Sequence, residues 1–238
     1  MKKSFIWVVV CLLITVGLFA CGGGGGGDAA SSTTTPIGTP VNLSVIKNFA
    51  EAKTQGSTMS FNMAGSSSVG ANLTGTFSGT ISAPTSTSTP SGTQTVNVFV
   101  QNVTITNTST GAFISAMTTY YYYQTGYLYK IVYDDGTIST PTSQTLLPSS
   151  AKVGDFGADM VVSNSDGSTD TSTWRIDPGT NGDAKFIYSF TYRDSLNVVT
   201  STSEDSYTIK PDGSISALSS KIYYPSSGMT LTLSGNKN

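Results

Sequence analysis

The longest uncharged stretch of the chain constrains its fold more than any other feature. Residues 54–129 are 76 consecutive positions, between Lys53 and Lys130, without Asp, Glu, Lys or Arg. Within residues 73–81, Leu, Gly, Phe, Gly and Ile fall on one face, and Thr and Ser fall on the other. Period-two alternation of β-favouring residues predicts strands that turn one face toward a core. Threonine takes the solvent-facing positions, because its branched Cβ suits a strand and its hydroxyl faces water.

Two further patterns in this stretch predict a strongly curved sheet. Gly75 and Gly79 lie on the apolar face, where a missing side chain indicates a bend or a close approach by another group. Valines at 96, 98 and 100 share one parity, whereas Val103 and Ile105 share the other. A change of parity inside one run predicts a β-bulge, here near residues 101–102.

The remaining sequence predicts one helix and a succession of strands. The helix is expected within Thr39–Gly56, capped by Ser44 and stopped by Gly56. Glycine-containing turns separate the later apolar runs, and residues 146–155 are expected to cross one end of the sheet. Beyond the alternating stretch, strands are expected at residues 113–123, 127–133, 159–164, 171–177, 184–193, 206–210, 215–224 and 229–233. The predicted fold is all-β with one short N-terminal helix, about ten strands forming a single strongly curved antiparallel sheet, half-barrel or barrel-like. A β-sandwich is the alternative.

The N-terminus carries a targeting signal. Lys2 and Lys3 precede an apolar run, which closes on Leu18-Phe19-Ala20-Cys21. This segment resembles the lipobox of bacterial lipoprotein precursors. The resemblance implies cleavage before Cys21, a lipid thioether on its sulfur and a fatty acyl group such as palmitate on its nitrogen. Ordinary signal cleavage or a retained anchor are the alternatives, although the 16-residue run Phe5–Ala20 is shorter than the roughly 20 residues that span a bilayer.

These features divide the chain into three parts. Residues 1–20 are expected to be the lipoprotein signal peptide, residues 21–40 the lipidated cysteine and a Gly/Ser/Thr/Pro tether, and residues 41–238 a single β-rich domain. In lipoproteins of diderm bacteria an Asp after the cysteine favours retention at the inner membrane. Because Gly22 stands there, the expected location is the cell outer membrane, lipid-anchored, on either its periplasmic or its surface face.

Composition excludes several function classes. Without Lys2 and Lys3, ten basic residues remain against 14 acidic ones, a net charge of −4, which disfavours binding to nucleic acid. The absence of histidine removes Ser-His-Asp and Cys-His catalysis and the common zinc sites. Asn164, Asp166 and Asp170 offer calcium-binding oxygens, but Val162 stands where the EF-hand pattern requires an acid, so a solvated Asp-Gly turn is the preferred interpretation. No enzyme, cofactor or metal is therefore expected, and acids clustered in a cleft are the feature that would favour an enzyme.

Aromatic residues are the remaining candidates for a site. Four consecutive tyrosines, residues 120–123, precede a second tyrosine-rich strand, and residues 186–192 form another aromatic face. In such a strand two of the four rings must point away from the core. The order of anchor, tether, short helix and antiparallel strands is similar to that of lipid carriers of the LolA and LolB type, which implies a curved sheet around an apolar cavity. The expected ligand-binding residues are Phe77, Ile81, Val98, Tyr120, Tyr122 and Tyr129.

Two functions remain open at this point. The first is an outer-membrane-anchored, non-catalytic lipoprotein, joined to the membrane through Cys21, that binds lipid or another apolar ligand within a curved sheet. The alternative is a structural or adhesive envelope lipoprotein with a filled core, whose neutral Thr, Ser and Asn faces contact glycan or protein. A cavity favours the first function and a solid interior favours the second.

Overall fold

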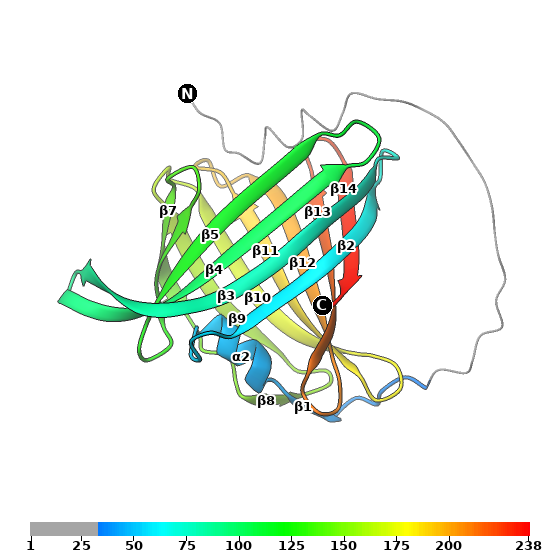
Figure 1. Ribbon diagram of the computed structural model, residues 1–238, viewed down its shortest axis with the longest axis horizontal. Helices are drawn as coiled ribbons and strands as arrows, with labels where there is room; N and C mark the ends of the chain where they lie inside the picture. The colour runs from blue at the N-terminus through cyan, green and yellow to red at the C-terminus, as the bar shows by residue number, and fades with distance from the viewer. Residues whose placement is uncertain (1–32) are drawn as a thin grey trace.

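Antiparallel pairing continues around a closed ring of strands in the computed structural model, which describes residues 33–238 (Figure 1). Cys21 and the whole signal segment lie outside these residues. The barrel strands are β2 (Thr58–Ser67), β3 (Asn72–Thr89), β4 (Gly92–Asn107), β5 (Phe113–Tyr123), β6 (Leu128–Tyr133), β7 (Ile138–Gln144), β9 (Phe156–Asn164), β10 (Thr169–Pro178), β11 (Ala184–Arg193), β12 (Val199–Ile209), β13 (Ile215–Tyr224) and β14 (Met229–Asn236). The short strands β1 (Pro40–Asn42) and β8 (Ser150–Lys152) pair separately.

The predicted all-β fold with a single curved antiparallel sheet is confirmed, and the sheet closes fully. It is therefore a barrel and neither a half-barrel nor a sandwich. The ring contains twelve strands where about ten were predicted. Strand β7 was not predicted, because Pro141 interrupts it and Ile138 is its one large apolar residue. The register shifts next to Pro141, where a strand tolerates proline.

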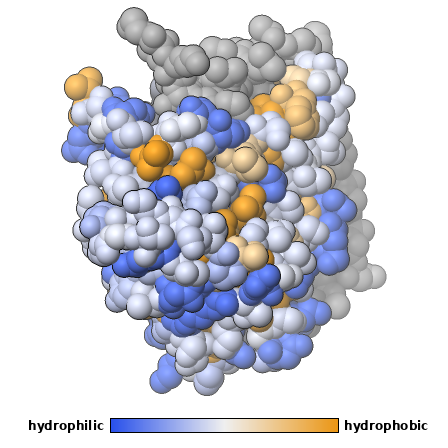
Figure 2. Space-filling view, turned by 60° about the vertical axis from the view of Figure 1, so that its left-hand side comes forward, coloured by the Kyte–Doolittle hydropathy of each residue, from blue (hydrophilic) through white to orange (hydrophobic). Residues whose placement is uncertain are grey.

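Inward and outward faces of the barrel differ sharply in polarity. Inward positions carry large apolar and aromatic side chains, such as Phe61, Phe186 and Leu231, which are completely or almost completely buried. Outward positions of β2, β3 and β14 carry mainly Thr, Ser and Asn, and Figure 2 shows a mostly hydrophilic outer face with small apolar groups.

A short helix closes one end of the barrel. Helix α2 (Ser44–Ala50) buries Ile46 and Phe49 against the barrel core (Figure 1). The predicted cap was wrong: the Ser44 backbone N–H donates to Asn42 Oδ1 at 2.9 Å, and the helix ends six residues before Gly56. No helix within residues 33–238 has the length and apolar character needed to cross a membrane.

A buried ion pair fastens this helix. Glu51, at the C-terminal end of α2, is 1% exposed, and its Oε1 lies 2.5 Å from Lys47 Nζ. Lys53 Nζ lies 2.6 Å from Oε2. Lys47 also donates to the carbonyl of Leu147, in the connection between β7 and β8. The segment 146–155 therefore crosses the helix-covered end of the barrel, as its sequence predicted.

The expected bulge near residues 101–102 does not exist. The pairing of β4 with both β3 and β5 runs through Gln101 and Asn102 without a shift. The change from even-numbered to odd-numbered apolar residues along β4 has another cause. Val103 and Ile105 face into the barrel, whereas Val96 and Val98 are buried on its outer side. The irregularity lies in β3 instead, between Ser82 and Thr85.

Glycines mark the positions where strands or rings approach most closely. A Cβ on Gly79 would lie 2.6 Å from a ring carbon of Phe99, and one on Gly75 would lie 2.3 Å from the backbone oxygen of Thr104. These contacts confirm the prediction of close approaches on this face. At the seam where β14 meets β2, a Cβ on Gly65 would lie 1.8 Å from the Thr232 oxygen. Only glycine fits there.

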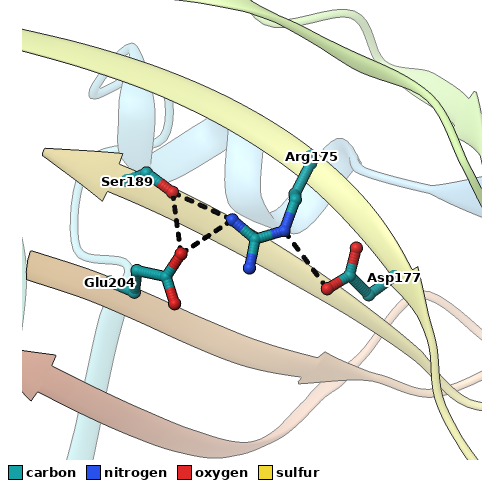
Figure 3. A network of polar contacts seen from close by, with 4 residues as sticks. All are labelled: Arg175, Asp177, Ser189 and Glu204. Carbon is teal, nitrogen blue, oxygen red and sulfur yellow. Dashed lines mark hydrogen bonds and ion pairs between the residues drawn. The ribbon is translucent and has the colours of Figure 1, made fainter.

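Charged side chains link three neighbouring strands on the outer face. Arg175 on β10 donates to Ser189 on β11 at 3.1 Å and to Glu204 on β12 at 2.8 Å (Figure 3). Its Nε also contacts Asp177 at 3.2 Å. These side chains are 38–45% exposed, so water screens the pairs, and they contribute little to stability.

Candidate functional site

An inner cavity of about 110 Å³ lies inside the barrel, next to helix α2. Its wall combines residues of the helix with inward-facing residues of eight barrel strands, and most of its surface is apolar. The lining residues are Ile46, Phe49, Ala50, Met59, Phe77, Phe99, Gln101, Tyr120, Tyr122, Asp159, Met160, Tyr188, Phe190, Asp205, Tyr207 and Ile215. The cavity has room for several water molecules or a small organic group.

Aromatic rings form two packed rows around this cavity. On one side, the centroids of Phe99 and Tyr120 are 5.6 Å apart, and Tyr120 stacks on Tyr122 at 6.5 Å. On the other side, Tyr188 contacts Phe186 edge to face at 4.7 Å. Inward parity produces both rows, because alternate residues of β5 and β11 face the interior. Burial raises the pKa of Tyr120, Tyr122 and Tyr188, so each keeps its phenolic proton.

Two carboxyl groups face the same cavity. Asp159 on β9 is 7% exposed, and its Oδ2 accepts a hydrogen bond from Ser172 at 2.6 Å. Among residues 33–238, no hydrogen bond reaches its other oxygen, Oδ1. Desolvation raises the pKa of Asp159 to about 6. Asp205 on β12 lies opposite Ser220 of β13, and desolvation raises its pKa also.

A second, outer cavity of about 450 Å³ lies toward the barrel end opposite α2. Gln101 lines both cavities, and the Tyr120 hydroxyl donates to its Oε1 at 3.3 Å. On β11, Tyr188 and Phe190 line the inner cavity and Tyr192 lines the outer one. The two cavities therefore follow one another along the interior, with the Tyr120–Gln101 pair at their boundary.

The outer cavity combines a mostly apolar surface with several acidic side chains. Five aspartates line it (Asp134, Asp135, Asp166, Asp170 and Asp194), against the single cation Arg193. Desolvation raises the pKa of Asp170 to about 6, although Asn164 Nδ2 donates to its carboxylate at 3.2 Å. Burial raises the pKa of Tyr133 to about 12. The mouth of the barrel is thus electronegative.

Three of the six predicted ligand-binding residues line the inner cavity and three do not. Phe77, Tyr120 and Tyr122 line the inner cavity. Ile81 is buried in the core on the same strand face but does not line it. Val98 and Tyr129 do not belong to the site.

Val98 and Tyr129 were placed wrongly for two different reasons. Val98 pairs with Ser82 and Tyr121, so it lies on the outer side of the barrel; the predicted bulge that would have placed it on the same face as Val103 does not exist. Tyr129 sits at a register shift between β5 and β6 and donates to the carbonyl of Ser88 at 3.0 Å, outside the interior. The Lys130 ammonium lies 4.8 Å from the Tyr121 ring centroid and 5.5 Å from that of Tyr129, so it partly covers these two rings.

Sequence reasoning missed both carboxyl groups of the inner cavity. Asp205 has the same parity as Tyr207 and Ile209, but the predicted strand began at Ser206 and left it out. No comparable sequence pattern marks Asp159, because it is the extra residue of β9 at the point where the pairing register with β10 shifts. The sequence did contain the aromatic face of residues 186–192, which supplies Tyr188 and Phe190.

The residues that offered calcium-binding oxygens, Asn164, Asp166 and Asp170, lie at a hairpin turn. The Asp166 carboxylate accepts the backbone N–H of Ser168, and Gly167 N–H donates to Asn164, which is a hairpin turn. Within the described part of the chain, no three acidic or sulfur side chains are arranged to hold a metal ion. No protein-family model, curated protein or solved structure matches this chain.

Proposed function

We propose that the chain is a non-catalytic lipoprotein, anchored in the outer membrane through Cys21, whose barrel interior binds an apolar or aromatic ligand. The observation that carries this proposal is the aromatic-lined inner cavity, closed by α2 at one end and followed by a larger cavity toward the other. The outer cavity of about 450 Å³ lies within the usual range of ligand pockets. Apolar walls with a few polar groups are typical of such pockets.

The unfilled interior favours this function over the structural or adhesive alternative. That alternative requires a filled core, because its binding surface is the outer face. Inward positions near the mouth are instead small: Ala116 and Thr118 line the outer cavity, where larger residues could have filled it. Anchoring at the outer membrane follows from the lipobox resemblance, and the barrel would then hold a ligand close to lipid.

Native mass spectrometry of the mature chain, purified from its own envelope, tests the proposal. We expect a co-purifying mass that the Ala116→Trp variant loses, since Trp at this inward position fills the outer cavity. Ser115→Trp is the matched control, because Ser115 is the neighbouring residue and faces outward. A folded wild-type barrel without any bound mass would contradict the proposal.

An enzyme is the second candidate, because Asp159 and Asp205 line one cavity. Two carboxyl groups on opposite sides of a bond can act as acid and base in hydrolysis. This candidate predicts that the wild type releases a cleaved ligand and that Asp159→Asn and Asp205→Asn retain the intact one. Intact ligand from the wild type favours the binding protein.

A further inference from the structure

Charge is distributed unevenly between the barrel interior and its exterior. Of the ten Lys and Arg residues after Cys21, only Arg193 lines either cavity. Lys130 and Arg175 lie on the outer face, and Lys47 is neutralised by Glu51 beneath the helix. In contrast, seven aspartates line the two cavities together, two in the inner and five in the outer. The interior therefore has an excess of negative charge.

Two of these carboxyl groups lie where a ligand would be most deeply buried. Asp159 is nine-tenths buried, faces the inner cavity and has one oxygen without a donor among the described residues. Asp205 faces the same cavity from β12. Asp159 accepts one hydrogen bond, from Ser172, but no cation of the described residues pairs with either carboxylate. A buried carboxylate without a counter-charge is unfavourable, so the site favours a positively charged group.

The aromatic rings beside these carboxylates favour the same kind of group. Phe99, Tyr120, Tyr122, Tyr188 and Tyr207 line the cavity that holds both aspartates. The faces of aromatic rings attract cations, and proteins recognise quaternary ammonium groups with such rings. An anionic ligand, such as a fatty acid, would bring its carboxylate toward Asp159 and Asp205 with no basic side chain to receive it.

We propose that the ligand of this barrel is an organic cation: a protonated or quaternary amine bound between Asp159, Asp205 and the aromatic rings of the inner cavity. Its apolar portion extends past Gln101 into the outer cavity. This inference rests on the proposed ligand-binding function and specifies the chemistry of the ligand. The five aspartates of the outer cavity attract the same class of molecule and raise its association rate.

Calorimetry at pH 8 on the full mature chain tests the assignment with three probes of equal chain length. Decyltrimethylammonium, decanol and decanoate are titrated below their aggregation concentrations, and Trp174 provides a fluorescence readout from the barrel interior, where it stacks on Phe186 at 6.1 Å. We expect the cation to bind at least tenfold more tightly than decanol, and decanoate to bind most weakly. The double variant Asp159→Asn/Asp205→Asn should lose at least tenfold for the cation and change decanol binding less than twofold.

A matched variant separates local from general charge effects. Asp212→Asn removes one carboxylate from an exposed turn at the α2 end, outside both cavities, and should leave all three affinities unchanged. Equal binding of the three probes, or tightest binding of decanoate, would overturn the cation assignment while leaving interior binding intact. If no probe binds, the cation assignment is wrong, and the proposed function fails only if native mass spectrometry also finds no ligand.

Discussion

Replacing Gly79 with alanine probes the packing between β3 and the inner aromatic row. The new Cβ would lie 2.6 and 2.7 Å from two ring carbons of Phe99 and 3.3 Å from the methyl of Met59. Phe99 cannot move freely, because its ring packs against Phe49 at 6.0 Å and Tyr120 at 5.6 Å. Overpacking of this kind destabilises the fold by about 1–3 kcal/mol. Alanine also restricts the unfolded chain more than glycine does, which stabilises the folded state by about 0.4–1 kcal/mol.

The net loss is therefore about 1–2 kcal/mol, which lowers the melting temperature by roughly 2–8 °C in a domain of this size. Thermal unfolding followed by circular dichroism measures the shift, and Gly79→Val should lower the melting temperature further. In a Phe99→Leu background, which lacks the two clashing ring carbons, Gly79→Ala should cost at least about 1 kcal/mol less.

Gly75→Ala is the matched control for this rescue. Its Cβ meets the backbone oxygen of Thr104, so Phe99→Leu should not relieve its cost. An unchanged melting temperature for Gly79→Ala, or equal costs in both backgrounds, would refute the packing argument.

Three further predictions concern the anchor, the buried charges and the helix. Cys21→Ser should release the protein from membranes; fractionation measures this, and continued retention would count against the anchor. Asp159 has a pKa raised to about 6 from its usual 3.8, so its contribution to stability is greatest below pH 3.8 and falls as the pH rises through 6. Asp159→Asn should accordingly raise the free energy of unfolding by about 3 kcal/mol at pH 8 and have little effect at pH 3.5, as urea titrations at both pH values would show. Lys47→Met should cost about 3 kcal/mol, because it leaves the carboxylate of Glu51 buried with one partner fewer. Glu51→Gln should cost less, because both lysines still reach water; the reverse order in chemical denaturation would contradict this account.

Alternation in the sequence predicted most of the barrel. The boundaries of β5, β11 and β13 agree with the predicted strands, because the regular alternation of each strand ends at a recognisable turn. Closure of the sheet could not be predicted. It depends on the pairing of β14 with β2, which are the last and first barrel strands, and no local pattern encodes such a contact.

The site was predicted only where its residues follow regular alternation. Phe77, Tyr120 and Tyr122 lie in strands whose parity is unbroken at those positions, and they line the cavity. Val98 was misplaced because valine occurs on both faces of β4, so apolar character alone did not give its orientation. Asp159 could not be predicted, because the register shift that turns it inward has no signature in its neighbours.

The glycine-lined seam between β14 and β2 has a consequence for how the protein is made. Every other adjacent pair in the barrel lies closer together along the chain, so an incompletely synthesised chain can form only an open sheet with two unpaired edges. Those edges persist until residues 229–236 arrive, and bare edges promote association with other chains. Loss of residues 229–236 would thus leave an open sheet that is prone to aggregate.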